Sequence, residues 1–179
     1  MIKKILIVVV GLCLISCTQK QATESASTID ETGFTTSVLV SDKLSLRWQV
    51  KDNTTLEAAL IGDPQGKGWI AIGFGKSIMS GAKIIVAQNG SDGTSVLDAT
   101  GYNYGLTNNA LTVISSKNVT LSGTAITASF NVTLSDVNIT LNESTPVIWA
   151  YRTVEQSTKD NLGNIGKHSS RGSSTITFK

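Results

Sequence analysis

The chain of 179 residues has little cysteine, histidine, proline or charge. Its two cysteines are Cys13 and Cys17, so no later residue can form a disulfide, supply a thiolate to a metal or act as a thiol nucleophile. The absence of a Cys-x-x-Cys-His motif excludes covalent haem attachment through thioether bonds. Charged residues make up 16% and form no basic block, which argues against sequence-independent binding of nucleic acid.

Serine and threonine take the place of the missing charge, with 21 and 22 copies beside 16 glycines. Threonine suits a pleated surface and glycine suits turns, so this composition favours strands over helices. A hydrophobic share of 40% is enough for a packed core, and the length fits one domain.

Residues 1–16 have a basic start and an apolar run of about a dozen residues, which is typical of a secretory signal peptide. The run is shorter than the roughly 20 residues of a membrane-spanning helix. Its end, Leu14-Ile15-Ser16-Cys17, resembles a bacterial lipobox, which implies cleavage before Cys17 and lipid attachment to it. An ordinary signal peptide cut slightly later is the alternative.

We therefore expect a signal peptide over 1–16, a lipidated Cys17 with a flexible polar tether over 17–32, and one folded domain over 33–179. Without residues 1–16 the chain has 13 basic and 13 acidic residues, so lipid rather than charge would hold it to a membrane. The predicted location is extracytoplasmic, on a bacterial membrane. Thr18, where an Asp often retains lipoproteins at the inner membrane, favours the outer one.

Short apolar segments with a period of two predict strands. Leu44, Leu46, Trp48 and Val50 alternate with polar residues, and 56–60 repeats the pattern after an Asp-Asn turn. Further apolar runs cover 69–74, 84–87, 96–99, 111–114, 125–130, 147–151 and 174–178, with turn residues between them. About ten such strands predict an all-β, immunoglobulin-like sandwich, with a long loop over 155–173.

Enzyme chemistry has little support in the sequence. His168 is the single histidine, so a zinc site would need carboxylates for its remaining ligands, which is uncommon. No Gly-x-Ser-x-Gly elbow is present, and the glycines of 73–81 do not form a phosphate-binding loop. We therefore expect a protein that is not an enzyme.

Three segments resemble the DOMON family. Residues 68–86 (GWIAIGFGKSIMSGAKIIV) match its pattern of a Trp-aliphatic strand, Gly-Phe-Gly, then Met-x-Gly-Ala-Asp and another strand. VIWAY with Arg152 looks like a later family strand, and 165–178 (IGKHSSRGSSTITF) looks like its closing segment. The resemblance extends from about Val38 to Phe178 and implies a DOMON-like sandwich.

The haem-binding branch of that family is similar to the cytochrome domain of cellobiose dehydrogenase and holds a non-covalent haem b between a Met and a His. Position by position, these axial ligands fall on Met79 and His168. Met79 is the only methionine after the first residue, and branches without haem lack the pair. Lys83 departs from the pattern, replacing an Asp that is not a ligand.

A haem also needs an apolar slot, for which Trp69, Phe74, Ile78 and Trp149 are candidate walls; ordinary core packing is the alternative for each. Arg171 or Lys167 is a candidate partner for a haem propionate.

Two function classes remain from the sequence. One is an extracytoplasmic b-type cytochrome that passes single electrons between a redox partner protein, or a quinone-linked membrane cytochrome, and another carrier. The other is a haem-free DOMON-like module that binds a sugar or another small ligand. A third hypothesis is a surface protein that carries or senses haem as cargo.

Overall fold

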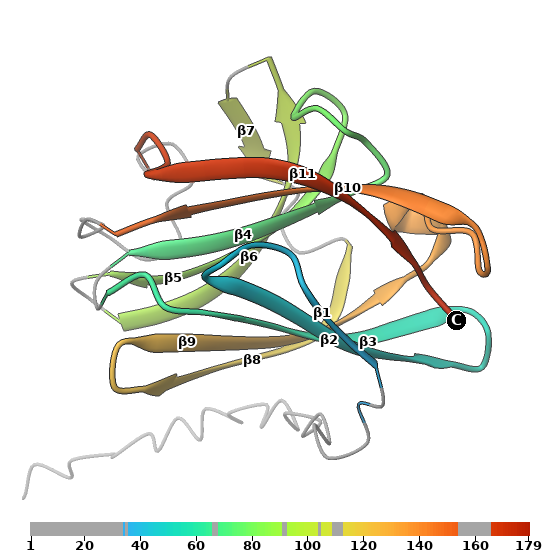
Figure 1. Ribbon diagram of the computed structural model, residues 1–179, viewed down its shortest axis with the longest axis horizontal. Helices are drawn as coiled ribbons and strands as arrows, with labels where there is room; N and C mark the ends of the chain where they lie inside the picture. Colours follow the sequence, from blue (N-terminus) through green and yellow to red (C-terminus); the bar gives the residue numbers. More distant parts are fainter. Residues whose placement is uncertain are drawn as a thin grey trace, which may run out of the picture.

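Two antiparallel sheets packed face to face form the domain (Figure 1). The computed structural model describes Phe34 and residues 36–65, 68–90, 93–103, 105–108, 113–153 and 166–179. The predicted all-β sandwich is confirmed, with eleven strands in the described part of the chain. The predicted signal peptide, Cys17 and the tether lie outside the described residues.

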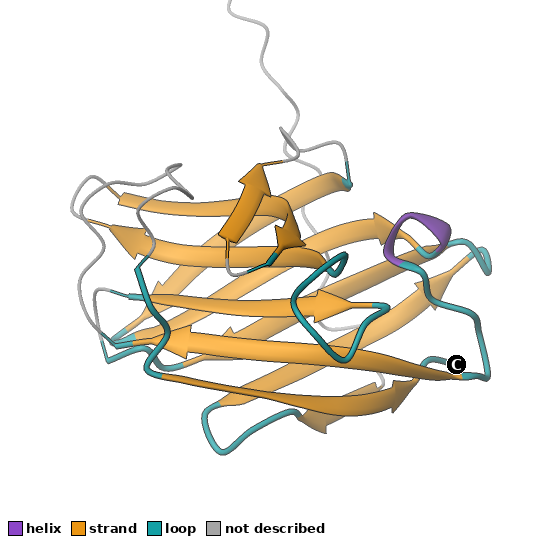
Figure 2. Ribbon diagram, turned by 90° about the horizontal axis from the view of Figure 1, so that it is seen from above, coloured by secondary structure: helices purple, strands orange, loops and turns teal. Residues whose placement is uncertain are grey.

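The first sheet has five strands in the order β1-β2-β3-β9-β8, and the second has six in the order β11-β10-β4-β5-β6-β7. The first sheet consists of β1 (Thr36–Leu39), β2 (Leu44–Lys51), β3 (Thr55–Gly62), β8 (Ile114–Ser122) and β9 (Ala125–Thr133). The second consists of β4 (Trp69–Phe74), β5 (Lys83–Gly90), β6 (Gly93–Tyr102), β7 (Gly105–Asn108), β10 (Ser144–Arg152) and β11 (Ser170–Thr177). A 3-10 turn, η2 (Ser135–Val137), lies at the same end of the sandwich as the C-terminus (Figure 2). No helix among the described residues is long and apolar enough to cross a membrane.

The core between the sheets follows from the alternation along each strand. Successive side chains of a strand point to opposite faces, so one face of each sheet carries the large apolar residues. The ring of Trp48 packs edge-on against that of Phe178 at 5.2 Å between centroids, and Phe74 lies 6.2 Å from the same ring. Phe178 therefore joins the two sheets after the last strand.

One open edge of the sandwich is closed by polar contacts between β6 and β8. The buried carboxylate of Asp98 accepts a hydrogen bond from the Val113 backbone N–H at 2.7 Å. The Lys117 ammonium donates to the Val96 carbonyl at 3.2 Å. These contacts fix the crossing from one sheet to the other.

Some elements differ from the sequence prediction. β8 begins at Ile114 and runs through the polar sequence SSKNVTLS, because an edge strand exposed on its outer face needs few apolar residues. The long loop predicted over 155–173 ends sooner, since β11 already begins at Ser170. The short strands β1 and β7 were not predicted by any apolar run.

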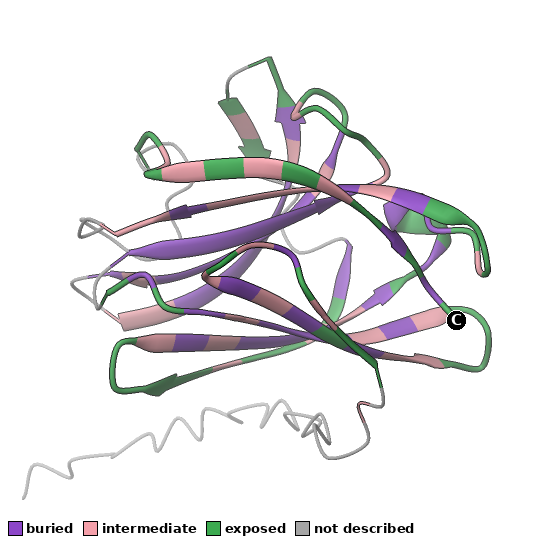
Figure 3. Cartoon of the chain, in the orientation of Figure 1, coloured by how far each residue is buried: buried purple, intermediate pink, exposed green. Residues whose placement is uncertain are grey.

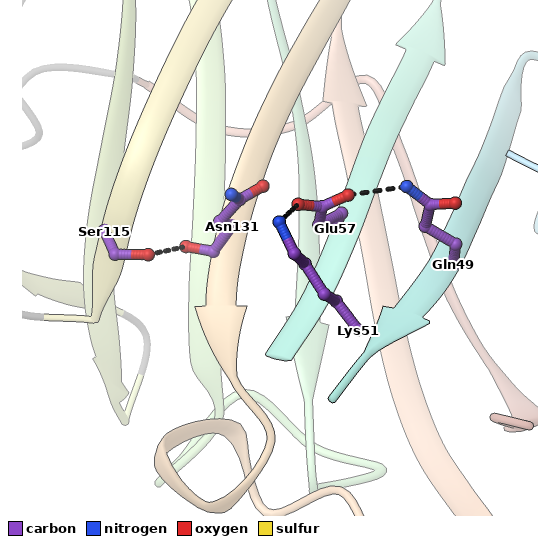
Figure 4. A network of polar contacts seen from close by, with 5 residues as sticks. All are labelled: Gln49, Lys51, Glu57, Ser115 and Asn131. Carbon is purple, nitrogen blue, oxygen red and sulfur yellow. Dashed lines mark hydrogen bonds and ion pairs between the residues drawn. The ribbon is translucent and has the colours of Figure 1, made fainter. Parts of the chain in front are cut away.

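The outer faces of the two sheets have opposite character. On the five-stranded sheet the Glu57 carboxylate accepts a hydrogen bond from Gln49 at 2.6 Å and lies 3.7 Å from the Lys51 ammonium (Figure 4). The Ser115 hydroxyl nearby donates to the Asn131 carbonyl at 3.3 Å. On the other sheet, by contrast, β4 is buried along its whole length (Figure 3). The outer face of the six-stranded sheet is therefore apolar along β4, and the β4 residues on it are buried from solvent.

Candidate functional site

A second apolar cluster covers the outer face of the six-stranded sheet, separate from the core between the sheets. Cross-strand register aligns Ala150 of β10, Ala71 of β4, Val86 of β5 and Leu97 of β6 in one row. The buried members are Trp69, Ala71, Ala82, Ile84, Val86, Leu97 and Ala99, with Met79, Leu106, Ile148 and Ala150 partly buried against them. Four of these eleven residues are alanines, so the cluster combines small and large apolar side chains.

Met79 reaches this face through the segment that connects β4 to β5. Its carbonyl accepts a hydrogen bond from the Ala82 N–H at 3.1 Å, while the Gly81 N–H donates to the Gly101 carbonyl of β6 at 2.8 Å. A Cβ at Gly101 would lie 1.9 Å from the Met79 carbonyl oxygen, so a side chain there would push the segment away. Gly101 thus lets the Met79 backbone lie directly on the sheet, with its thioether beside the apolar cluster.

His168 approaches the same face from the segment before β11. Its Nε2 lies 3.3 Å from Nη1 of Arg171, whose register partner is Ala150 of the apolar cluster. Partial burial, and then the nearby Arg171 charge, lower the pKa of His168 below 6.5. Because a guanidinium can only donate, this contact requires a neutral imidazole with an unprotonated Nε2. That is the form in which histidine binds metal.

The segments that carry Met79 and His168 rise on the side of the six-stranded sheet that faces away from the other sheet (Figure 1). They adjoin opposite ends of β4, with the apolar cluster between them. Among the described residues, the charged side chains that neighbour or contact the His168 segment are cationic: Lys167, Arg171 and Arg152. Asp98, the one carboxylate in the six strands, faces the core instead.

These residues fit the haem b that the resemblance implies. A thioether and an imidazole are neutral ligands of the kind that hold haem iron, and an apolar surface suits the macrocycle. Cations next to His168 would suit the propionate carboxylates of the haem. No three His, Cys, Asp or Glu side chains gather among the residues that the structure describes.

The candidate wall residues are not all brought together. Trp69 is buried in the outer-face cluster, as a wall residue should be, whereas Ile78 beside Met79 is 64% exposed. Phe74 lies on the opposite face of β4, in the core between the sheets. Trp149 also packs toward that core and stacks on Tyr151. For Phe74 and Trp149 the alternative of core packing describes the observed position. Ile78 neither lines the cluster nor fills the core.

The position of Phe74 in the core predicts how its replacement affects stability and haem uptake. The Phe74→Ala variant should lose about 3–5 kcal/mol of unfolding free energy, because it leaves a cavity in the core. Haem uptake by the folded fraction should remain unchanged, since the side chain lies away from the outer face. Urea unfolding and a haem titration would measure both. Phe130→Ala is the matched control, because Phe130 is equally buried in the other sheet. A selective loss of haem by Phe74→Ala would contradict this placement.

Several residues of the site were missed by reasoning from the sequence. Ala71, Ala99 and Gly101 form its floor, and Arg152 contacts the His168 segment. A signal was present: small residues recur at alternate positions of β4 and β6, as expected where something approaches a sheet closely. Lys83, the departure from the family pattern, donates to the Thr100 hydroxyl at 3.2 Å.

Comparisons with known proteins agree with this architecture. The DOMON domain matches residues 40–152. No curated protein matches the chain. The cytochrome b domain of pyranose dehydrogenase from Coprinopsis cinerea matches with a TM-score of 0.57 and 13% identity, over 74% of this chain and 75% of that one. The cytochrome domain of Myriococcum thermophilum cellobiose dehydrogenase matches with a TM-score of 0.53 and 10% identity, over 76% and 75%. At these identities the likeness shows the fold.

Proposed function

The chain belongs to the DOMON domain family, and we propose that it is an extracytoplasmic b-type cytochrome that binds one haem b through Met79 and His168 and transfers single electrons. One observation carries the proposal. The only methionine after the first residue and the only histidine of the chain both lie on the outer face of one sheet, around its apolar cluster.

Each residue has a definite part in this proposal. Haem held by two protein ligands supplies one-electron exchange between ferric and ferrous iron. His168 would offer a neutral imidazole nitrogen, and Nε2 would give up its contact with Arg171 if it were the ligating atom. Met79 would offer a softer thioether that favours the ferrous state. If Met79 and His168 both held the iron, electron transfer would be favoured over binding of oxygen or a substrate. The apolar face would help to exclude water from the bound group.

The likeness in fold to two cytochrome domains supports a haem-binding module. The apolar character of the face also favours a macrocycle over a sugar, whose hydroxyls need hydrogen-bonding partners when they are buried. A haem-free sugar-binding module is therefore the weaker alternative.

The test is an absorption spectrum of the full chain, made with added haem and no polyhistidine tag. Sharp visible bands on reduction with dithionite, typical of six-coordinate low-spin haem, would support the proposal. A colourless protein that takes up no haem would overturn it.

We also propose that lipid on Cys17 anchors the domain to a bacterial membrane, where the outer membrane is favoured. The partner would be a redox protein or a quinone-linked membrane cytochrome. Cys17→Ala should abolish labelling by radioactive palmitate and shift the protein from the detergent phase to the aqueous phase in a partitioning assay. Cys13→Ala, within the signal peptide, is the matched control and should leave the mature protein labelled. Unchanged detergent partitioning of Cys17→Ala would mean that another element holds the protein.

A further inference from the structure

Arg152 makes the contacts that hold the backbone next to His168. It is the last residue of β10 and the register partner of Trp69, so its side chain lies on the outer face with the apolar cluster. Its Nη1 donates a hydrogen bond of 2.8 Å to the Lys167 carbonyl. The bond goes to the backbone immediately before His168, independently of the Lys167 side chain.

The segment also packs on the guanidinium group. Gly166 has a φ of +66°, a conformation that favours glycine. A Cβ at this position would lie 2.1 Å from Nη1 and 2.6 Å from Cζ of Arg152. The chain therefore lies against the guanidinium, and the segment depends on both a glycine and a planar cation.

On the other side of His168 the chain is fixed by β10 itself. The Ser169 N–H donates to the Tyr151 carbonyl at 2.8 Å, and the Ser169 hydroxyl accepts from the Thr153 N–H at 3.1 Å. The end of β10 thus holds the backbone on both sides of His168, while the imidazole between them contacts Arg171.

We propose that Arg152 is a positioning residue for His168, holding the backbone so that the imidazole is presented toward the apolar cluster. This inference rests on the proposed function, because it concerns how the protein orients a haem ligand. Replacing Arg152 by Ala releases one side of the segment, while the His168 side chain itself is still present in the chain. Haem binding must then also supply the free energy that orders His168, so the affinity for haem falls.

The first measurement needs no cofactor. Because His168 is the single histidine, its imidazole protons are assigned in an NMR spectrum without ambiguity. Arg152→Ala should move the imidazole signals of haem-free protein toward their positions in an unstructured peptide. Arg47→Ala, which removes an exposed arginine from the other sheet, should leave them unchanged. Unmoved signals in folded Arg152→Ala would overturn the proposal.

The second measurement is a double-mutant cycle on haem release, followed by transfer of haem to excess apomyoglobin. Arg152→Ala should release haem about 10-fold faster or more, within the range for losing a partner of a metal ligand. Arg152→Lys should restore part of this loss, because an ammonium still donates to the Lys167 carbonyl but lacks the planar surface under Gly166. In the His168→Ala background, loaded at haem concentrations high enough to fill its weakened site, Arg152→Ala should add no further change, since its effect passes through His168.

The outcomes separate the two proposals. An equal acceleration in both backgrounds would overturn the positioning role and indicate that Arg152 contacts the cofactor itself. Gly166→Ala checks the inference without removing the charge, and it should also displace the imidazole signals. Failure of the wild-type protein to take up haem would overturn the proposed function together with the role of Arg152 as a haem-ligand positioner. An additive cycle in a haem-binding wild type overturns the positioning role alone.

Discussion

The His168→Ala variant is expected to lose most of its haem. Imidazole is the stronger of the two ligands, and His168 is the only imidazole that the chain can supply. The affinity should fall by more than the roughly 10–100-fold that removal of an outer-shell partner costs. Titration of haem into haem-free protein, followed by the Soret absorbance, measures the change.

A control must separate loss of the ligand from loss of the fold. The His168 side chain lies in a segment outside both sheets, so the thermal midpoint of haem-free His168→Ala should stay close to that of the wild type. Ser170→Ala, two residues later in β11, should keep its haem. Wild-type affinity in the His168→Ala variant would mean that another group binds the iron.

The Met79→Ala variant should keep much of its haem but with an open sixth coordination position. The thioether is the weaker donor, so His168 continues to hold the iron. Reduced Met79→Ala should therefore bind carbon monoxide, which the reduced wild type should not bind. The Soret shift on addition of the gas is the measurement, with Ile78→Ala as the matched control because that neighbour is exposed.

Two further replacements of Met79 distinguish a ligand from a packing residue. Met79→His should retain six ligands and lower the reduction potential, because a stronger donor favours the ferric state. Met79→Leu has a similar volume, so it should leave the spectrum and potential unchanged if Met79 only packs against the sheet. An unaltered Met79→Leu spectrum would contradict the ligand assignment, even in a protein that proves to be a cytochrome.

Alternation in the sequence predicted the sandwich because most strands have one face on a core. It worked for β2, where Leu44, Leu46 and Trp48 are buried between polar residues. It failed for β8, an edge strand whose exposed residues follow no apolar pattern. Strands such as β1 and β7, each four residues long, are too short for a period of two to stand out.

The candidate site was predicted only in part, for a geometric reason. The resemblance suggested Met79 and His168 as ligands, which stays a prediction; in the structure Met79 packs on the outer-face cluster and His168 contacts Arg171 beside it. Which of the nearby aromatic residues share that face depends on strand parity. Trp69 and Phe74 are five positions apart in β4 and so point to opposite sides. A continuous apolar run such as WIAIGF does not show which residues point to which face, because β4 is buried on both faces and no polar residue marks the alternation.

Arg152 could not be found from local sequence, and Gly101 only in part. Their roles arise from segments distant in the chain, one lying against residues 166–167 and the other against Met79. The contact of Arg152 leaves no pattern within its own strand, whereas small residues at alternate positions of β6 indicate a close approach without showing which segment approaches. Register between strands, rather than periodicity along one, decides such contacts.

The position of β11 determines when the site can first exist during biosynthesis. β11 lies at the edge of its sheet, pairs with β10 and directly follows the segment that carries His168. A chain still emerging from the ribosome, or from an export channel, therefore has Met79 long before it has a docked His168. Ile176 and Phe178, which hold β11 to the core, follow His168 in the chain. Capture of the proposed haem would therefore wait until synthesis has passed β11, and a product that ends before His168 would lack the second ligand.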